Sequence, residues 1–197
     1  MRRPFLVHQL VEECAERAPD APFVVHEQTT ASYGEVRERA RAWAALLARE
    51  GVRRGDRVGL LARNGFLYVE AYYGILAAGG IAVPLNTALD GRGIKQLLSD
   101  CGARVLIAGH GFAPVIEAGV AGADGLQQVI GSEDACRAAE AAGVACLPAG
   151  AVDQARGLPV PDGTPVDLDV ASIIYTSGST GRPRGARYEL CSLGVSR

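Results

Sequence analysis

The segment from Thr176 to Gly185 is the part of the chain whose side chains could do chemistry. Its ten residues, Thr-Ser-Gly-Ser-Thr-Gly-Arg-Pro-Arg-Gly, include three glycines, four hydroxyl side chains and two arginines. Glycines let backbone N–H groups converge on an anion, hydroxyls donate further hydrogen bonds, and a guanidinium offsets negative charge. The composition therefore predicts a phosphate-binding loop. The alternative is an ordinary turn, since glycine, serine and threonine are common in turns.

The phosphate-binding pattern of P-loop kinases and GTPases does not fit this segment. That pattern requires four residues between two glycines, followed by lysine and then serine or threonine. Counting from Gly178, the next glycine is already Gly181, and no Lys-Ser pair follows it. We therefore expect a phosphate-binding loop of a different kind.

The elements that must position this segment alternate between helices and apolar strands. The apolar spacing, the S-x-x-E capping box at Ser32 and the glycine and proline positions predict helices over 6–18, 33–50, 66–78, 94–99, 113–118 and 134–142, and strands over 22–27, 57–62, 81–83, 104–108, 126–130 and 170–175. Strands that are apolar throughout belong to a sheet covered on both faces. We therefore predict an α/β fold with a mainly parallel layered sheet and right-handed crossovers, a connecting segment over 143–169, and the segment from Thr176 to Gly185 as a loop after the last strand.

Composition and charge exclude several classes of protein. The 197 residues are 48% hydrophobic and 21% charged, which is typical of a folded globular chain and not of a disordered one. The formal net charge is −2, without a long block of like charge, so we expect neither a nucleic-acid partner nor a charged membrane surface. The start, Met1-Arg2-Arg3, is similar to a twin-arginine export signal, but polar residues follow from His8 onward where such a signal is apolar. No window approaches a membrane span, so a cytoplasmic protein is expected.

Isolated cysteines and histidines give no metal or catalytic pattern. The five cysteines are scattered and no CxxC pair occurs, so we expect free structural thiols and neither a zinc site nor a disulfide framework. The isolated histidines are expected at the surface or in the core and not as catalytic bases. Trp43 falls on the apolar face of its helix, where packing is the expected role. The residues concerned are Cys14, Cys101, Cys136, Cys146, Cys191, His8, His26 and His110.

The stretch from Tyr175 to Gly185 resembles the YTSG[ST]TGxPKG signature of the AMP-forming adenylate synthetase superfamily. This superfamily includes acyl-CoA ligases, luciferases and peptide-synthetase adenylation domains. The one departure at a fixed position is Arg184, where the family carries lysine. Three earlier segments resemble family elements in order and spacing: residues 32–35 (TYxEL), 51–58 (GVxxGDRV) and 79–86 (AGGxxVPLN).

The resemblance implies ATP-dependent activation of a small-molecule carboxylate through an acyl-adenylate, with Mg²⁺ and with coenzyme A as co-substrate, as in fatty acid metabolism. It implies that residues 1–186 are the N-terminal part of an AMP-binding (adenylation) domain and that 187–197 form a divergent tail. It also implies that the β- and γ-phosphates bind Thr176, Ser177, Gly178, Ser179, Thr180, Gly181 and Arg184. Arginine keeps the charge of the family's lysine but replaces a mobile point charge with a planar fork.

Family members are considerably longer and continue with an apolar strand and a THxN segment, whereas this chain reads Arg187-Tyr-Glu-Leu after Ala186. In the family, the later part holds the adenine and ribose motifs, an acidic magnesium ligand, most of the acyl pocket and a catalytic lysine. Lys95, the only lysine here, lies too early to match that residue. We therefore expect no catalytic residue and no turnover from this chain by itself. The alternative is a non-catalytic remnant of a frameshifted or prematurely terminated gene, with at most weak phosphate binding.

Overall fold

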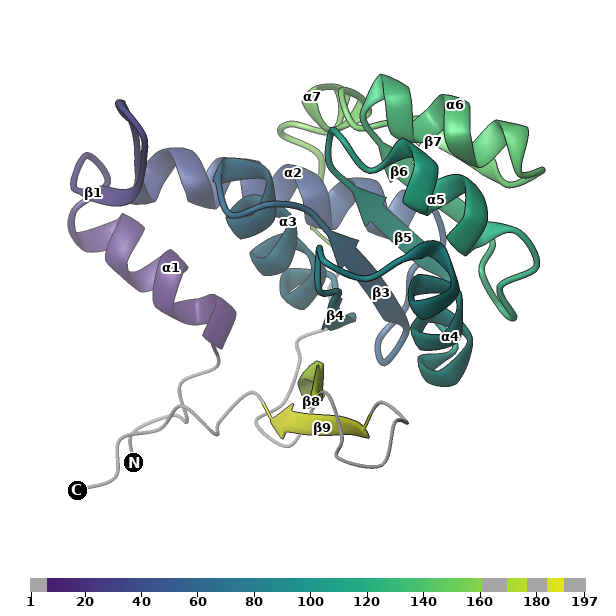
Figure 1. Ribbon diagram of the computed structural model, residues 1–197. Helices are drawn as coiled ribbons and strands as arrows, with labels where there is room; N and C mark the ends of the chain where they lie inside the picture. Colours follow the sequence, from purple (N-terminus) through teal and green to yellow (C-terminus); the bar gives the residue numbers. More distant parts are fainter. Residues whose placement is uncertain (1–6, 161–169, 177–183, 190–197) are drawn as a thin grey trace.

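The computed structural model describes residues 7–160, 170–176 and 184–189 (Figure 1). The helices are α1 (Val7–Arg17), α2 (Tyr33–Arg49), α3 (Phe66–Ala77), α4 (Gly91–Cys101), α5 (Ala113–Val120), α6 (Glu133–Ala141) and α7 (Ala151–Gln154). The strands are β1 (Pro22–His26), β2 (Thr29–Ser32), β3 (Arg57–Leu61), β4 (Ile81–Pro84), β5 (Val105–Ala108), β6 (Gln128–Gly131), β7 (Ala145–Pro148), β8 (Val170–Thr176) and β9 (Arg184–Glu189). The predicted α/β fold is confirmed.

The main sheet has seven strands in the order β7-β6-β5-β3-β4-β8-β9. The strands from β7 to β8 in this order run parallel, and only β9 is antiparallel to its neighbour. The chain leaves β3 for β4 on one side and then returns to place β5 on the other side, which is the doubly wound arrangement. β8 joins this sheet at a single register pair, Ala82 with Ser172. The predicted mainly parallel sheet is confirmed.

Helices cover both faces of the sheet, as Figure 1 shows. On one face α2, α3 and α7 pack over side chains such as Val58, Val105 and Ile107. On the other face α4, α5 and α6 pack over Leu61, Leu106 and Val129. Because successive strand residues point to opposite faces, both sets must be apolar, and this explains the uninterrupted apolar runs in the sequence.

Helix α2 begins at the predicted capping box. The Ser32 hydroxyl accepts a hydrogen bond from the Glu35 N–H at 3.2 Å, and the Glu35 carboxylate accepts one from the Ser32 N–H at 2.8 Å. Trp43 in the same helix is fully buried, so its predicted packing role is confirmed. Its indole packs where α3 presents Gly74, and this close approach ties the two helices together.

The sequence does not predict three short elements, and two of them, β2 and β7, are strands that depend on pairing. The expected connecting segment over 143–169 contains β7 and α7, and β2 follows the predicted strand β1. β7 is a four-residue edge strand that ends in Pro148, and such a strand carries little periodicity of its own. β2 forms because its backbone pairs with β1 across a turn at Glu27, whose φ is 54°.

The prediction of free thiols is wrong for two of the five cysteines. Cys136 on α6 and Cys146 on β7 form a disulfide, with 5.2 Å between their Cα atoms. Helix α6 packs against β7, and this crossover brings the two residues together. Cys14 and Cys101 are free thiols, and Cys191 lies outside the described residues.

Candidate functional site

The chain segment with phosphate-binding composition is bordered by the antiparallel strands β8 and β9. The register pairs Thr176 with Arg184 and Tyr175 with Gly185, so the two ends of the segment lie side by side. The predicted extent of the loop, from Thr176 to Gly185, is wrong at both ends. Thr176 is the last residue of β8, and Arg184 and Gly185 open β9, because strand pairing satisfies the backbone groups there.

The predicted phosphate-binding residues divide into two groups. The backbones of Thr176 and Arg184 are brought opposite each other at the strand ends. The remaining predicted residues, Ser177, Gly178, Ser179, Thr180 and Gly181, lie outside the described residues. The structure therefore places the two borders of the segment next to each other.

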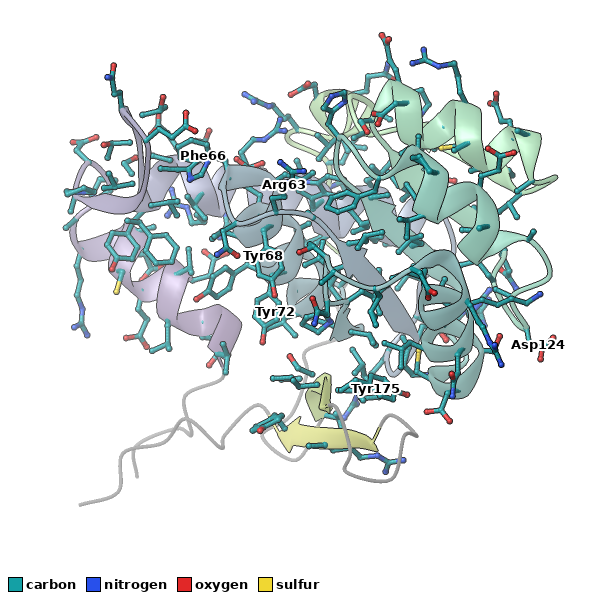
Figure 2. All side chains as sticks on the ribbon, in the orientation of Figure 1. Arg63, Phe66, Tyr68, Tyr72, Asp124 and Tyr175 are labelled. Carbon is teal, nitrogen blue, oxygen red and sulfur yellow. A yellow bond between two sulfur atoms is a disulfide. The ribbon has the colours of Figure 1, made fainter. Side chains whose placement is uncertain are left out.

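Side-chain hydrogen bonds join β8 to helices α3 and α4. The hydroxyls of Tyr72 on α3 and Ser172 on β8 lie 2.7 Å apart, and Ser172 is buried. The Tyr175 hydroxyl donates to the carboxylate of Asp100, near the end of α4. Figure 2 shows Tyr175 projecting from β8 toward the body of the molecule, with Tyr72 reaching down from α3. β8 is thus attached to α3 and α4 through side chains and to β4 through its backbone.

A cavity of about 500 Å³ lies between the β8–β9 pair, the end of α4 and the starts of β3 and β4. Its charged lining comes from Arg57, Asp100 and Arg187. The Arg57 guanidinium makes hydrogen bonds within the protein. It donates to the carbonyls of Gly55, Cys101 and Gly102 at 3.1, 2.7 and 3.0 Å. Arg57 therefore acts as a brace between β3 and α4.

Cys101 also lines this cavity, but as a protonated thiol. Burial raises the pKa of the Cys101 thiol, and this outweighs the hydrogen bonds and the nearby Arg57 that act to lower it. Because only a thiolate is a strong nucleophile or metal ligand, Cys101 is a poor candidate for either role.

A second polar cluster lies where β5 and β6 end, and the sequence analysis missed it. The Asp134 carboxylate accepts hydrogen bonds from the Ser132 hydroxyl (2.7 Å), the Gly111 N–H (2.8 Å) and His110 Nδ1 (2.9 Å). Although partial burial acts to raise the pKa of Asp134, these hydrogen bonds outweigh it, and that pKa lies well below its usual range. The S-x-D spacing of Ser132 and Asp134 at a helix start was the available signal.

This cluster gives a test of stability against pH. At pH 7, Asp134→Asn should lower the free energy of unfolding by about 1–2 kcal/mol, because a neutral amide with one acceptor oxygen replaces a charged acceptor with two. A carboxyl with a lowered pKa contributes stability above its unfolded pKa, near 3.9, and loses it as the pH falls through the folded value. The difference from the wild type should therefore shrink below about pH 4 in urea titrations. Asp124→Asn, at an exposed position, should change the stability by less than about 0.5 kcal/mol.

The described residues offer neither a metal cluster nor a membrane helix. Over 7–160, 170–176 and 184–189, no group of three or more His, Cys, Asp or Glu side chains is arranged to hold a metal ion. Among the helices of these same ranges, none has the length and apolar character needed to cross a membrane.

Comparison with protein-family models gives one match, described as AMP-binding enzyme, over residues 11–190. The chain is similar to a feruloyl-CoA synthase from Amycolatopsis sp, with 37% identity over 173 residues. That alignment covers 87% of this chain and 31% of the relative. It is also similar to the polyketide synthase PksN of Bacillus subtilis (strain 168), with 33% identity over 93% of this chain and 3% of the relative. The chain thus spans about a third or less of these relatives.

Solved structures agree with this similarity. The N-terminal domain of FACL13 from Mycobacterium tuberculosis, solved with a bound inhibitor, matches with a TM-score of 0.78 and 28% identity, over 94% of this chain and 44% of that one. The anthranilate CoA ligase AuaEII, solved in complex with anthranoyl-AMP, matches in fold with a TM-score of 0.83 and 24% identity. That match covers 97% of this chain and 35% of the ligase.

Proposed function

The chain belongs to the AMP-binding enzyme family, and from this premise we propose that its signature segment, Thr176 to Gly185, binds the β- and γ-phosphates of ATP. The observation that carries the proposal is the pairing of Thr176 with Arg184, which brings both borders of the segment together. The residues proposed to contact the phosphates are Thr176, Ser177, Gly178, Ser179, Thr180, Gly181 and Arg184.

The donors in this segment fit a polyphosphate. Hydroxyl groups, glycine N–H groups and one guanidinium can all donate to phosphate oxygens, and none of them carries negative charge. Bound magnesium would neutralise phosphate charge. Magnesium takes oxygen ligands, and the hydroxyl groups of this segment and the phosphate oxygens would supply them on this side of the site.

The proposed reaction is the activation of a carboxylic acid. A carboxylate oxygen forms a bond to the α-phosphorus of ATP while the bond from that phosphorus to the bridging oxygen breaks, which yields an acyl-adenylate and pyrophosphate. The signature segment would hold the departing pyrophosphate and orient the α-phosphorus for attack. The thiol of coenzyme A would then take the acyl group and release AMP. Similarity to a feruloyl-CoA synthase supports this choice of thiol.

A narrower proposal applies to the 197 residues by themselves, which are expected to bind phosphate without completing the reaction. The observation that favours it is coverage, since the chain spans 31% of the feruloyl-CoA synthase. Alignment of the reactants and stabilisation of developing charge fail together when part of a site is missing.

Two measurements on the purified chain test these proposals. Calorimetric titration with magnesium pyrophosphate and with MgATP should detect weak binding, and a complete absence of heat with both would contradict the phosphate site. Carboxylate-dependent exchange of labelled pyrophosphate into ATP, over short, long and aromatic acids, should stay at the level of a heat-inactivated control. Exchange clearly above that control would show that these residues suffice for adenylate formation.

A further inference from the structure

Tyr175 and Gly185 lie opposite each other where β8 and β9 border the signature segment. A Cβ atom built on Gly185 would lie 3.3 Å from Cζ of the Tyr175 ring and 3.0 Å from Cγ2 of Ile173. Both distances are shorter than ordinary van der Waals contact, so a side chain at position 185 would have to displace one of these neighbours. The absence of a side chain at Gly185 therefore allows the Tyr175 ring to lie across β9.

The far end of the Tyr175 ring is also held. Its hydroxyl donates to the Asp100 carboxylate, and Asp100 lies one residue before the end of α4. Burial raises the pKa of the Tyr175 phenol, and the hydrogen bond to Asp100 raises it further. The phenol consequently stays protonated and keeps donating throughout the neutral range. One side chain thus contacts β9 with its ring and α4 with its hydroxyl.

This contact matters because it joins the β8–β9 pair to α4 beyond the point where β8 pairs with β4. The backbone of β8 pairs with β4 at one register position, Ala82 with Ser172. The hydrogen bond between Ser172 and Tyr72 anchors β8 at that same level. Tyr175 is three residues further along, directly before the signature segment, so its hydrogen bond is the anchor closest to the proposed phosphate site.

We propose that Asp100 and Gly185 are positioning residues that hold Tyr175, and through it the β8–β9 pair, so that the signature segment is oriented to bind phosphate. The expected effect on binding rests on the proposed function, whereas the anchoring of the β8–β9 pair by Tyr175 does not. Tyr175 and Gly185 are the first and last residues of the stretch that resembles the family signature. The geometry here gives both of them a physical role. Asp100 lies 75 residues before Tyr175 and outside that signature.

The test uses two readouts on the full chain. Tyr175→Phe and Asp100→Ala should each weaken magnesium pyrophosphate binding about three- to tenfold, the effect expected from losing one hydrogen bond. Hydrogen exchange of peptides covering 170–176 and 184–189, measured without nucleotide, should become faster by a similar factor. Gly185→Ala should likewise weaken binding and speed hydrogen exchange, because its methyl group displaces the Tyr175 ring. The urea midpoint of the whole chain should move little, since the β8–β9 pair joins the other five strands of the sheet at one backbone register pair.

Three comparisons separate positioning from a general loss of stability. The double variant Asp100→Ala/Tyr175→Phe should be no worse than either single variant, because both remove the same bond. Asp100→Asn keeps an acceptor oxygen and should retain more affinity than Asp100→Ala. Tyr188→Phe, on β9 and 46% exposed, removes the same hydroxyl from a neighbouring position and should change neither readout.

The possible outcomes separate the positioning role from the phosphate site. Unchanged hydrogen exchange in Tyr175→Phe and Asp100→Ala, or additive losses in their double variant, would overturn the positioning role. If the wild type binds neither pyrophosphate nor ATP while exchange still quickens in these variants, the phosphate site fails and the anchoring of β8–β9 by Tyr175 stands. Faster hydrogen exchange combined with weaker pyrophosphate binding in these variants supports both the positioning role and the phosphate site.

Discussion

The double variant Thr180→Ala/Arg184→Ala should lose at least about a hundredfold in affinity for magnesium pyrophosphate. A hydrogen bond to a charged group contributes about 1.5–3 kcal/mol, and every 1.4 kcal/mol is a factor of ten in affinity. Removing one hydroxyl donor and one guanidinium from a phosphate site therefore removes about 3 kcal/mol or more. Calorimetric titration at fixed ionic strength measures the loss.

The control for this experiment removes the same chemical groups elsewhere. Thr29→Ala/Arg137→Ala takes a hydroxyl and a guanidinium from exposed positions on β2 and α6. Its net charge equals that of the test variant, so a non-specific effect of charge on anion binding would appear in both. Equal affinities of the wild type and the Thr180→Ala/Arg184→Ala variant would remove the signature segment from the phosphate site.

Gly74→Ala should produce the largest loss of stability, with a net decrease of about 2–3 kcal/mol in the free energy of unfolding. A Cβ at this position would overlap Cβ of Trp43 and lie 3.0 Å from the carbonyl oxygen of Ala40. Both contacts belong to α2, which is already fully packed, so α2 and α3 would have to separate. Alanine's better helix propensity, about 1 kcal/mol, offsets only part of this cost.

Urea unfolding monitored by the fluorescence of Trp43, the only tryptophan, measures this change directly. Gly150→Ala is the matched control. At Gly150 φ is −60°, and a Cβ would meet nothing within 4 Å. Its stability should therefore stay within about 1 kcal/mol of the wild type. A Gly74→Ala protein as stable as the Gly150→Ala protein would show that the α2–α3 contact is looser than the structure places it.

The sequence alone determined the class of the sheet and most of the elements, and it predicts phosphate binding by the signature segment. Apolar runs such as residues 104–108 predict strands buried on both faces, and the capping box at Ser32 predicts where α2 begins. These signals are local, because hydrophobic periodicity and caps act over a few residues. Each was recovered within a few residues of its position in the structure.

Only the tertiary structure decided which distant residues meet. The disulfide between Cys136 and Cys146, the Asp134 cluster and the hydrogen bond from Tyr175 to Asp100 join residues of different elements. Short β7 and β9 exist because they pair with β6 and β8. A lone strand of four to six residues has too little local preference to form, and it gains its stability from backbone partners supplied by another part of the chain. The sequence therefore predicts the phosphate chemistry, whereas the positioning of Tyr175 follows from the way α4, β8 and β9 pack.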